Sequence, residues 1–405
     1  MTLFVDISPL KNNPNYALLF TGQFVSFIGT MITSVALPYQ VYQLTHSSLM
    51  VGLLSLLQLI PLLITALLGG VFADKYNRRG LIIISEICLI LGCALLTINA
   101  NSSQPTLIGI FVIASLMSAI TGLHRPALDS MTQQLVEPRD YKALGVLTSF
   151  KYSFCMIVGP AIAGLIIAHL GMVLTYFIDL LTFVVSLITL SLMKNLPKPI
   201  VAKSSSAFSA LKEGIQFAFK RQELLGSYCV DFIAMIFAMP NALFPAIAQS
   251  LGGAQTLGLL YAAPAVGALF ISFFSGWTAA IKHDGKAIAI AAAFWGIAMV
   301  GFGLSVSLAW ALFFLALSGA FDAISGIFRS TLWNHTIPHD YRGRLAGIEM
   351  ISYLSGPRLG DTRAGIVASA AGITTAIVSG GIFCVFGVAV CCFFMPKFWK
   401  YASDT

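Results

Sequence analysis

The stretch Ser118-Ala-Ile-Thr-Gly-Leu-His-Arg-Pro-Ala-Leu128 decides the fold, because it recurs as Asp322-Ala-Ile-Ser-Gly-Ile-Phe-Arg-Ser-Thr-Leu332 at an offset of 204 residues. Downstream, the segment Pro138–Lys142 matches Pro338–Arg342 at an offset of 200. Two more pairs have offsets of 206 and 201 residues: Val51–Ser55 with Leu257–Tyr261, and Ala163–Gly171 with Ala364–Gly372. Nearly constant offsets in a chain of 405 residues indicate that the second half is a copy of the first.

The composition points to a protein embedded in lipid. Hydrophobic residues make up 58% of the chain, charged residues only 10%, and the mean hydropathy is +0.88. Soluble proteins carry roughly 25% charged residues, so these charges are too few to cover a surface that faces water. The seven cysteines lie in apolar runs without CxxC spacing, which is typical of core residues. We therefore expect no metal site and no cofactor.

The apolar runs predict twelve membrane-spanning helices, because a crossing needs about 20 apolar residues. The expected spans are 16–42, 48–72, 81–99, 106–134, 142–169, 172–193, 224–249, 255–278, 286–305, 308–335, 344–370 and 373–395. The predicted fold is an all-α integral membrane protein with two six-helix pseudo-repeats. Residues 1–196 form the first bundle, 197–223 a cytoplasmic linker with an amphipathic helix, and 224–405 the second bundle. No short apolar core with a cleavage site precedes the first span, which argues against a cleaved signal peptide.

The basic residues predict the orientation of the chain in the membrane. Both termini and alternate connectors hold 18 of the 23 lysines and arginines, five lie within spans, and the other connectors hold none. The positive-inside rule therefore places both termini in the cytoplasm. The net charge of +7 is explained by topology, and no nucleic-acid motif accompanies it.

The connector after the second span reads Gly69-Gly-Val-Phe-Ala-Asp-Lys-Tyr-Asn-Arg-Arg79 and resembles the signature of the major facilitator superfamily at this place. Asn77 departs from the family pattern, which has glycine there. The resemblance covers the whole chain and implies a transporter with a gate on the cytoplasmic side. The residues that it assigns to this gate are Gly70, Asp74, Lys75, Arg78 and Arg79, with Asp129 as a further partner. The alternative is that these charges only set the topology.

Gly159, Pro160 and Gly164 look like the Gly-Pro motif in the fifth helix of exporters of this superfamily. Segments such as Ala242–Ala246 and Leu259–Pro264 are similar to the branch that contains enterobactin-exporter-like and macrolide-efflux proteins. That branch implies export of siderophores or amphiphilic drugs from the bacterial cytoplasm, driven by protons. It also implies a multi-pass protein of the bacterial inner membrane, acting as a monomer with a small-molecule substrate and protons as its partners.

Charged residues inside the predicted spans are the candidates for substrate binding and proton coupling, because a charge at the bilayer centre costs about 2.5–3.5 kcal/mol. They are Asp322, Asp231, Arg125, Arg329, Lys151, Arg358 and Asp361. Asp322 is the first candidate for proton coupling and Asp231 the second. The resemblance implies that Arg125, Asp322 and Arg329 line a central cavity, where arginine suits an anionic or phenolate-bearing substrate.

Each of these assignments has a structural alternative. Arg125 is four residues from Asp129 and is suited to pair with it, Arg358 and Asp361 suit an internal ion pair, and either coupling aspartate suits a permanent arginine partner. Three further acidic residues lie in the spans, and Asp179 among them is a weaker candidate. Asp179 should bond a neighbouring helix, whereas Glu86 and Glu349 should be solvated near the cytoplasmic surface.

Other function classes fit the sequence less well. No histidine pair has the spacing of a helix-borne metal site, no Gly-Lys-Ser/Thr phosphate-binding stretch occurs, and no Ser/His/Asp arrangement indicates an enzyme. The alternatives that stay open are an importer of a nutrient or metabolite and a lysolipid transporter, both with the same fold.

Overall fold

The computed structural model describes residues 7–194, 213, 216–338 and 342–403. Within these ranges, the side chains of residues 70, 71, 73–75, 138, 342–344, 346–348 and 350 lie outside the description. The predicted linker at 197–223 falls largely on residues that are not described, although 216–220 are helical.

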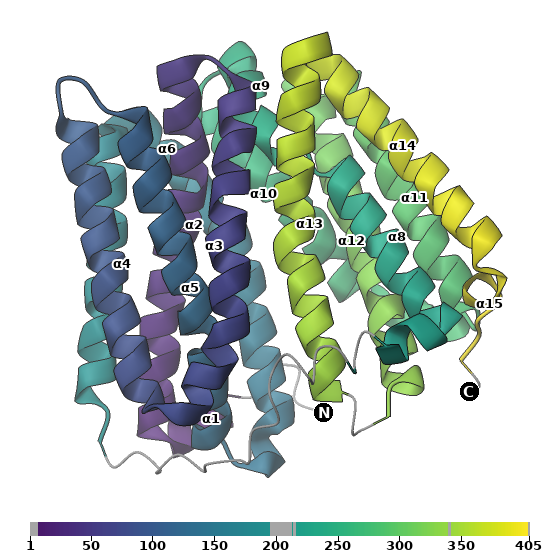
Figure 1. Cartoon of the computed structure of the whole chain (residues 1–405), viewed down its shortest axis with the longest axis horizontal. Helices are drawn as coiled ribbons and strands as arrows, with labels where there is room; N and C mark the ends of the chain where they lie inside the picture. Colours follow the sequence, from purple (N-terminus) through teal and green to yellow (C-terminus); the bar gives the residue numbers. More distant parts are fainter. Residues whose placement is uncertain (1–6, 195–212, 214–215, 339–341, 404–405) are drawn as a thin grey trace. The chain divides into compact units, whose positions relative to one another are not determined.

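All the regular secondary structure of the described residues is helical (Figure 1). The first half contains α1 (Ser8–Asn12), α2 (Pro14–Thr45), α3 (Ser48–Lys75), α4 (Arg78–Asn101), α5 (Leu107–Leu135), the 3-10 turn η1 (Pro138–Asp140) and α6 (Tyr141–Leu192). The second half contains α8 (Gln222–Ala238), η2 (Asn241–Leu243), α9 (Phe244–Leu251), α10 (Ala254–Phe273), η3 (Ser275–Ala280), α11 (Asp284–Gly303), α12 (Leu308–Thr336), α13 (Arg342–Ala371), α14 (Ile373–Phe394) and α15 (Pro396–Trp399).

Ten segments of the described chain are long and apolar enough to cross a membrane. One of them, α6, has 52 residues and contains two spans, because Gly171 breaks its backbone with φ 75° and ψ 179°. A further helix of 30 residues, α13, carries Arg358, Asp361 and Arg363 near its middle. Dividing α6 at Gly171 and adding α13 gives the twelve spans that the sequence predicts.

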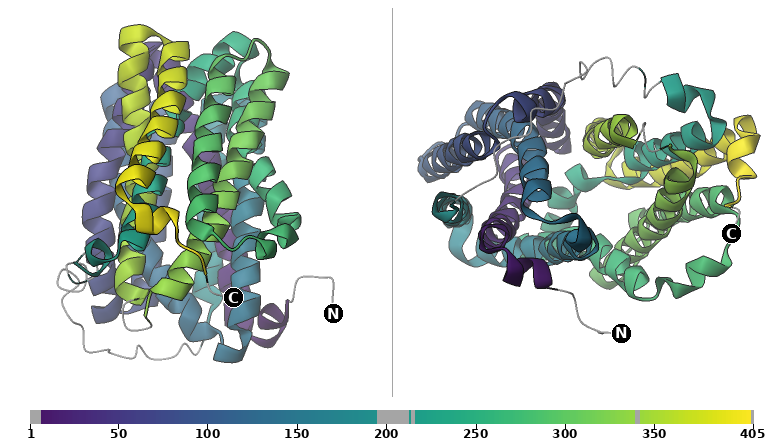
Figure 2. Two further views of the ribbon diagram at one scale, coloured as in Figure 1. Left: turned by 90° about the vertical axis from the view of Figure 1, so that its right-hand side faces the viewer. Right: turned by 90° about the horizontal axis from the view of Figure 1, so that it is seen from below.

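The helices gather into two compact units. Unit 1 comprises residues 1–44 and 57–207, and unit 2 comprises 45–56 and 208–405. The division cuts through α3, whose first residues belong to unit 2 and the rest to unit 1. In unit 1 the helix α4 lies against α5 and α6, and in unit 2 the helix α11 lies against α12 and α14 (Figure 2). Equivalent helices of the two halves therefore make equivalent contacts.

Small residues let the helices of unit 1 approach closely. Gly159 of the Gly-Pro motif lies against α2, where an added methyl group would be 3.3 Å from Met31 Cγ and 3.4 Å from the Ile28 carbonyl oxygen. Pro160 and Gly164 beside it are buried in the same helix. The motif thus acts in this unit as a contact surface between α6 and α2.

The predicted span 224–249 differs from the structure, because it is broken near Pro240. The helix α8 ends at Ala238, and the chain passes through η2 before α9 begins at Phe244. Met239 is extended, with φ −119° and ψ 93°, as the residue before a proline prefers. A break inside a span exposes backbone N–H groups that must find acceptors elsewhere in the protein.

Candidate functional site

One arginine of unit 2 is shared by two carboxylates. Arg329 on α12 forms an ion pair with Asp231 on α8, and its Nη2 lies 3.6 Å from Oδ1 of Asp322, seven residues earlier on α12. The side chains of Arg329 and Asp231 are 12% and 8% exposed, whereas that of Asp322 is 43% exposed. The structure thus brings three predicted site residues together as a charged triad.

The charges of the triad do not balance. Arginine stays protonated in proteins, so one cation faces two carboxylates and the triad carries one excess negative charge when both are ionised. A single proton on either carboxylate makes the triad neutral. Asp231 has the direct ion pair and the more buried side chain, and the more exposed Asp322 is the group with the better access for a proton or a ligand.

A cavity of about 270 Å³ lies close to the triad in unit 2. Its lining consists of Tyr228, Ser330, Trp333, Asn334, Ile337, Leu345 and Glu349. Two of these, Tyr228 and Trp333, are stacked with ring centroids 5.1 Å apart. The exposed Glu349 interacts electrostatically with Arg329, so the cavity and the triad are linked. The exposure of Glu349 agrees with the sequence prediction.

The cavity offers both apolar and polar contacts to a ligand. Trp333 Nε1 is buried and has no hydrogen-bond partner among the described residues, although an indole N–H normally finds one when buried. Ser330 and Asn334 add polar atoms to the two aromatic walls. An engineered cavity of about 150 Å³ holds a benzene molecule, so about 270 Å³ suits a group the size of one or two fused rings.

Asp361 stabilises the broken span. Its Oδ1 accepts a hydrogen bond from the Ala242 backbone N–H at 2.8 Å, and its Oδ2 accepts one from Ser55 Oγ at 3.1 Å. Arg358 lies within electrostatic range, so the expected pairing contributes, but these hydrogen bonds run to η2 and to the start of α3. The sequence spacing identified Arg358 as a partner of Asp361 but gave no sign of its hydrogen-bond donors Ser55 and Ala242.

The predicted charges of unit 1 form a looser group. Asp129 interacts electrostatically with Arg125, Lys151 and His124, in agreement with the expected proximity of Arg125 and Asp129. Arg125 and Asp129 are exposed, and the Lys151 ammonium lies 6.0 Å from the centre of the Phe20 ring. The geometry is compatible with the cavity-lining role of Arg125 and with its structural alternative.

Part of the predicted gate lies outside the described side chains, namely Gly70, Asp74 and Lys75. Arg79 donates through Nη2 to the carbonyl oxygens of Leu190 and Ser191, both at 2.9 Å, at the end of α6. Asn77, which departs from the family pattern, accepts a hydrogen bond from the Gly80 N–H and caps α4. Arg79 thus pairs with the end of a helix, as expected for a cation near a helix C-terminus.

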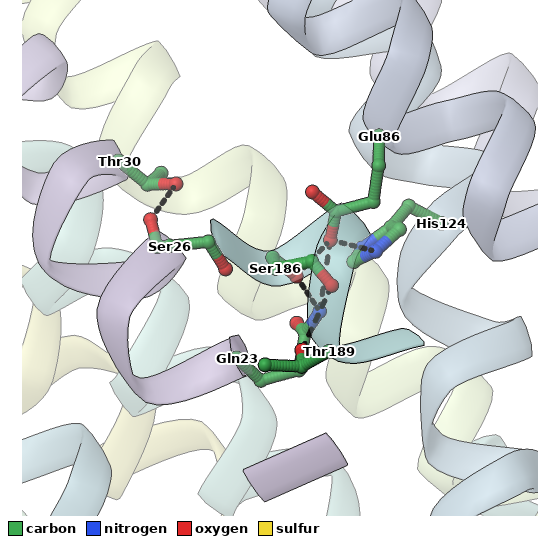
Figure 3. A network of polar contacts seen from close by, with 7 residues as sticks. All are labelled: Gln23, Ser26, Thr30, Glu86, His124, Ser186 and Thr189. Carbon is green, nitrogen blue, oxygen red and sulfur yellow. Dashed lines mark hydrogen bonds and ion pairs between the residues drawn. The ribbon is translucent and has the colours of Figure 1, made fainter. Parts of the chain in front are cut away.

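The prediction that Glu86 is solvated is wrong, because its side chain is fully buried in unit 1. Its Oε1 accepts hydrogen bonds from Gln23 Nε2 at 2.9 Å and from Ser186 Oγ at 2.8 Å. The imidazole of His124 lies 3.4 Å away through Nε2 (Figure 3). The signal that the sequence did contain is a polar residue inside three apolar runs, Gln23, Glu86 and Ser186, each on a different helix.

Asp179 is a second buried carboxylate of unit 1. It accepts hydrogen bonds from Thr33 on α2, from Cys93 Sγ on α4 at 3.4 Å and from Thr182 Oγ1 at 3.2 Å. The prediction that Asp179 bonds neighbouring helices is confirmed.

Comparison with known families decides the identity of the fold. A family profile described as "Transmembrane secretion effector" matches residues 5–404. The chain belongs to this family. The transmembrane secretion effector family has the major facilitator fold, so the chain is a multi-pass membrane transporter and not an enzyme. The expected resemblance to the major facilitator superfamily is thereby confirmed.

Proteins similar to this chain include enterobactin exporters named EntS. The exporter of Salmonella typhi is 26% identical over 379 residues, which cover 93% of this chain and 91% of the exporter. That of Escherichia coli O81 (strain ED1a) is 26% identical over 387 residues, covering 95% and 92%.

Solved structures of transporters share the fold. A bacterial homologue of the human lysosomal transporter Spinster has a TM-score of 0.74 at 14% identity, covering 98% of this chain and 99% of its own. A POT family transporter in complex with 5-aminolevulinic acid has a TM-score of 0.74 at 13% identity, covering 96% and 97%. These likenesses establish the fold alone.

Proposed function

We propose that this transporter is a proton-coupled antiporter that exports a small amphiphilic molecule from the bacterial cytoplasm by alternating access. The observation that carries the proposal is the sharing of Arg329 by Asp231 and Asp322. A triad with one excess negative charge binds either a proton or a cationic group, and its arginine is available to an anion once Asp322 is neutralised. Proton binding and substrate binding are then linked through one side chain.

The proposed cycle follows from the charges of the triad. A proton on Asp322 weakens the attraction to Arg329 and leaves the arginine paired with Asp231. An anionic or phenolate group of a substrate competes for the freed side of the guanidinium. Transfer of one proton across ~100 mV releases about 2.3 kcal/mol, enough for roughly a fifty-fold substrate gradient.

The proposed substrate class is a siderophore or an amphiphilic drug such as a macrolide. The relatives at 26% identity are named enterobactin exporters, which favours a siderophore. The cavity with the stacked rings of Tyr228 and Trp333 and the polar side chains of Ser330 and Asn334 fits an amphiphilic aromatic group. Asp361, Arg358, Lys151 and Arg125 are proposed to shape the polar surroundings of the transport path.

The test uses purified protein in proteoliposomes with an imposed pH gradient. Labelled enterobactin and a labelled macrolide are followed separately. We expect Asp322→Asn to abolish the response of transport to the pH gradient, and Asp231→Asn to reduce it. Glu137→Gln is the matched control, because Glu137 is 66% exposed and pairs with Arg139 at the surface. Transport that still responds fully to the gradient in both aspartate variants would remove the coupling assignment.

The direction of transport is tested in membrane vesicles of both orientations. An exporter accumulates its substrate in everted vesicles, whereas an importer does so in right-side-out vesicles. A labelled lysolipid tested in the same vesicles distinguishes the third alternative.

We further propose that the protein lies in the bacterial inner membrane with both termini in the cytoplasm. The support is the distribution of lysine and arginine among the connectors. A fluorescent protein fused after residue 405 should be bright, and alkaline phosphatase inserted at Ser103 between α4 and α5 should be active. The opposite pattern would reverse the orientation.

A further inference from the structure

A buried acid and an imidazole meet in unit 1, on other helices than those that carry the triad of unit 2. The carboxylate of Glu86 on α4 is fully buried, and Oε1 lies 3.4 Å from Nε2 of His124 on α5. Gln23 on α2 and Ser186 on α6 donate to the same oxygen, and the Gln23 amide also donates to Ser186 Oγ at 3.1 Å. Figure 3 shows these four side chains converging from four helices.

The Glu86–His124 pair lies among apolar side chains. Ile82, Ala127 and Leu190 of one hydrophobic core lie within a turn of Glu86, His124 and Ser186 along their helices, so the pair borders apolar side chains. A charge buried in such surroundings is costly unless it is paired or neutralised by a proton. Two polar atoms of the pair, Glu86 Oε2 and His124 Nε2, have no hydrogen-bond partner that meets good geometry among the described residues.

The charged and titratable groups around the pair come from every helix that meets it. Asp179 on α6 interacts electrostatically with Glu86. Asp129, further along α5, interacts with His124. On α4, the Cys93 thiol donates to Asp179, and Arg79 donates to carbonyl oxygens at the end of α6. On α2, the titratable group is Tyr16, which lies in the same hydrophobic core. The charge of Asp179 thus acts on Glu86, and that of Asp129 acts on His124.

We propose that Glu86 and His124 form a proton-binding pair that takes up and releases one proton inside the membrane-spanning part of unit 1. Glu86 is closed off from the surroundings, and the His124 side chain retains 12% exposure, so the imidazole is the member that receives the proton. A proton added at Nδ1 lets the Nε2 proton pass to the carboxylate, and release runs in reverse. No other bond forms or breaks.

The bonds of Glu86 suit both states of the pair. With the proton on the imidazole, Oε1 accepts from Gln23 and Ser186 and lies 3.4 Å from Nε2 of the charged His124. With the proton on the carboxyl group, the neutral acid still offers an oxygen that accepts from Gln23 and Ser186. The scaffold of polar side chains therefore stays in place when the proton moves, which is a property of a preorganised site.

The experiment follows the carboxyl group of Glu86 directly and does not depend on transport. Full-length protein in lipid nanodiscs carries ¹³C only in its glutamate carboxyl groups, and infrared spectra are recorded between about pH 5 and 9. The chain has five glutamates, and the structure places Glu86 as the one with no exposed side-chain surface. The band of Glu86 is identified by comparison with the Glu86→Gln variant, which lacks this carboxyl group.

We expect a labelled carboxylic acid band that grows as the pH falls within this range. Glu86→Gln should remove the band while keeping the bonds to Gln23 and Ser186. His124→Gln should move the midpoint of the band, because the two groups share one proton. Asp179→Asn is the matched control with another buried carboxyl group of unit 1, and the band should persist in it.

Two results would overturn the proposal. A folded wild-type protein whose labelled glutamate spectrum does not change between about pH 5 and 9 contains no such site. A band that titrates identically with and without His124 would assign the proton to Glu86 alone. If a variant fails to fold, ¹⁵N-labelled histidine in the wild-type protein gives the same answer, because one of six histidines must then titrate together with the glutamate band. If the wild-type protein shows no pH-driven transport but keeps the band, the proposed coupling role of the unit 2 triad fails and this pair stands.

Discussion

The guanidinium of Arg329 lies 3.6 Å from the carboxylate of Asp322, seven residues earlier on α12, and also pairs with Asp231 on α8. Loss of one member of a buried ion pair is more harmful than loss of both, because the remaining charge has no partner. We expect Arg329→Gln to lower the free energy of unfolding by roughly 3–5 kcal/mol. The double variant Arg329→Gln/Asp231→Asn should lose less than the sum of the two single variants.

Thermal unfolding in detergent measures this double-mutant cycle for the triad. Coupled residues show interaction energies of about 0.5–3 kcal/mol. Additive effects would mean that the Arg329–Asp231 pair is not a direct contact. Glu137→Gln serves as the surface control, since its ion pair with Arg139 is exposed and worth about 0–1 kcal/mol.

Asp361 should be needed for the stability of the broken span. Asp361→Ala removes the acceptor for the Ala242 N–H and for Ser55, and leaving a buried donor unpaired costs about 1–3 kcal/mol. Asp361→Asn keeps one oxygen acceptor and should cost less than the alanine variant. Ser55→Ala removes one of the two bonds and should cost about 0.5–1.5 kcal/mol. Equal melting temperatures for Asp361→Ala and Asp361→Asn would contradict the capping role.

Gly159 should tolerate no side chain, in contrast to another glycine of α6. A methyl group at Gly159 would meet Met31 and Ile28 on α2, and overpacking of this kind costs about 1–3 kcal/mol. Gly145, on the same helix, has no other group within 4 Å of an added methyl group. We expect Gly145→Ala to be neutral or to stabilise the helix by up to about 1 kcal/mol. The prediction fails if both alanine variants unfold at the same temperature.

Gly171 should be required because of its backbone conformation, and not because a side chain at this position would clash with its neighbours. Its φ of 75° and ψ of 179° are accessible to glycine, and an added methyl group would have nothing within 4 Å. Gly171→Ala should therefore lower the free energy of unfolding by about 1–3 kcal/mol through backbone strain alone. Gly145→Ala again supplies the control. An unchanged melting temperature for Gly171→Ala would show that the two spans of α6 also join in another geometry.

The positions of the spans could be predicted because each depends on a local run of apolar residues and on charges at its ends. The duplication was visible from the constant offset between residues 118–128 and 322–332. Asp322 and Arg329 could be paired from the sequence, because seven residues place them on one face of a helix. Their shared partner Asp231 was identified only as a separate candidate, since it lies on another helix 91 residues earlier.

The features that could not be predicted depend on contacts between distant residues. Prolines lie inside several helices of this chain, such as Pro61 and Pro160, without ending them. Pro240 sits at a break that Asp361 stabilises through a hydrogen bond from Ala242, which is 119 residues away along the chain. From the sequence, Glu86 is expected to be solvated. The side chains that bond it in the protein interior, Gln23 and Ser186, are 63 and 100 residues away along the chain, so the sequence near Glu86 does not reveal them.

The first residues of α3 belong to unit 2, where Thr362 Oγ1 donates to the Gly52 carbonyl oxygen at 3.2 Å and Ser55 donates to Asp361. Dividing the chain between its two sequence repeats therefore separates residues 45–56 from the rest of unit 2. A fragment ending near residue 207 would carry the 45–56 segment away from the partners that complete it. We expect two such fragments to regain activity only when they are synthesised together in one cell, because the first half then supplies the residues that Asp361 and Thr362 bond.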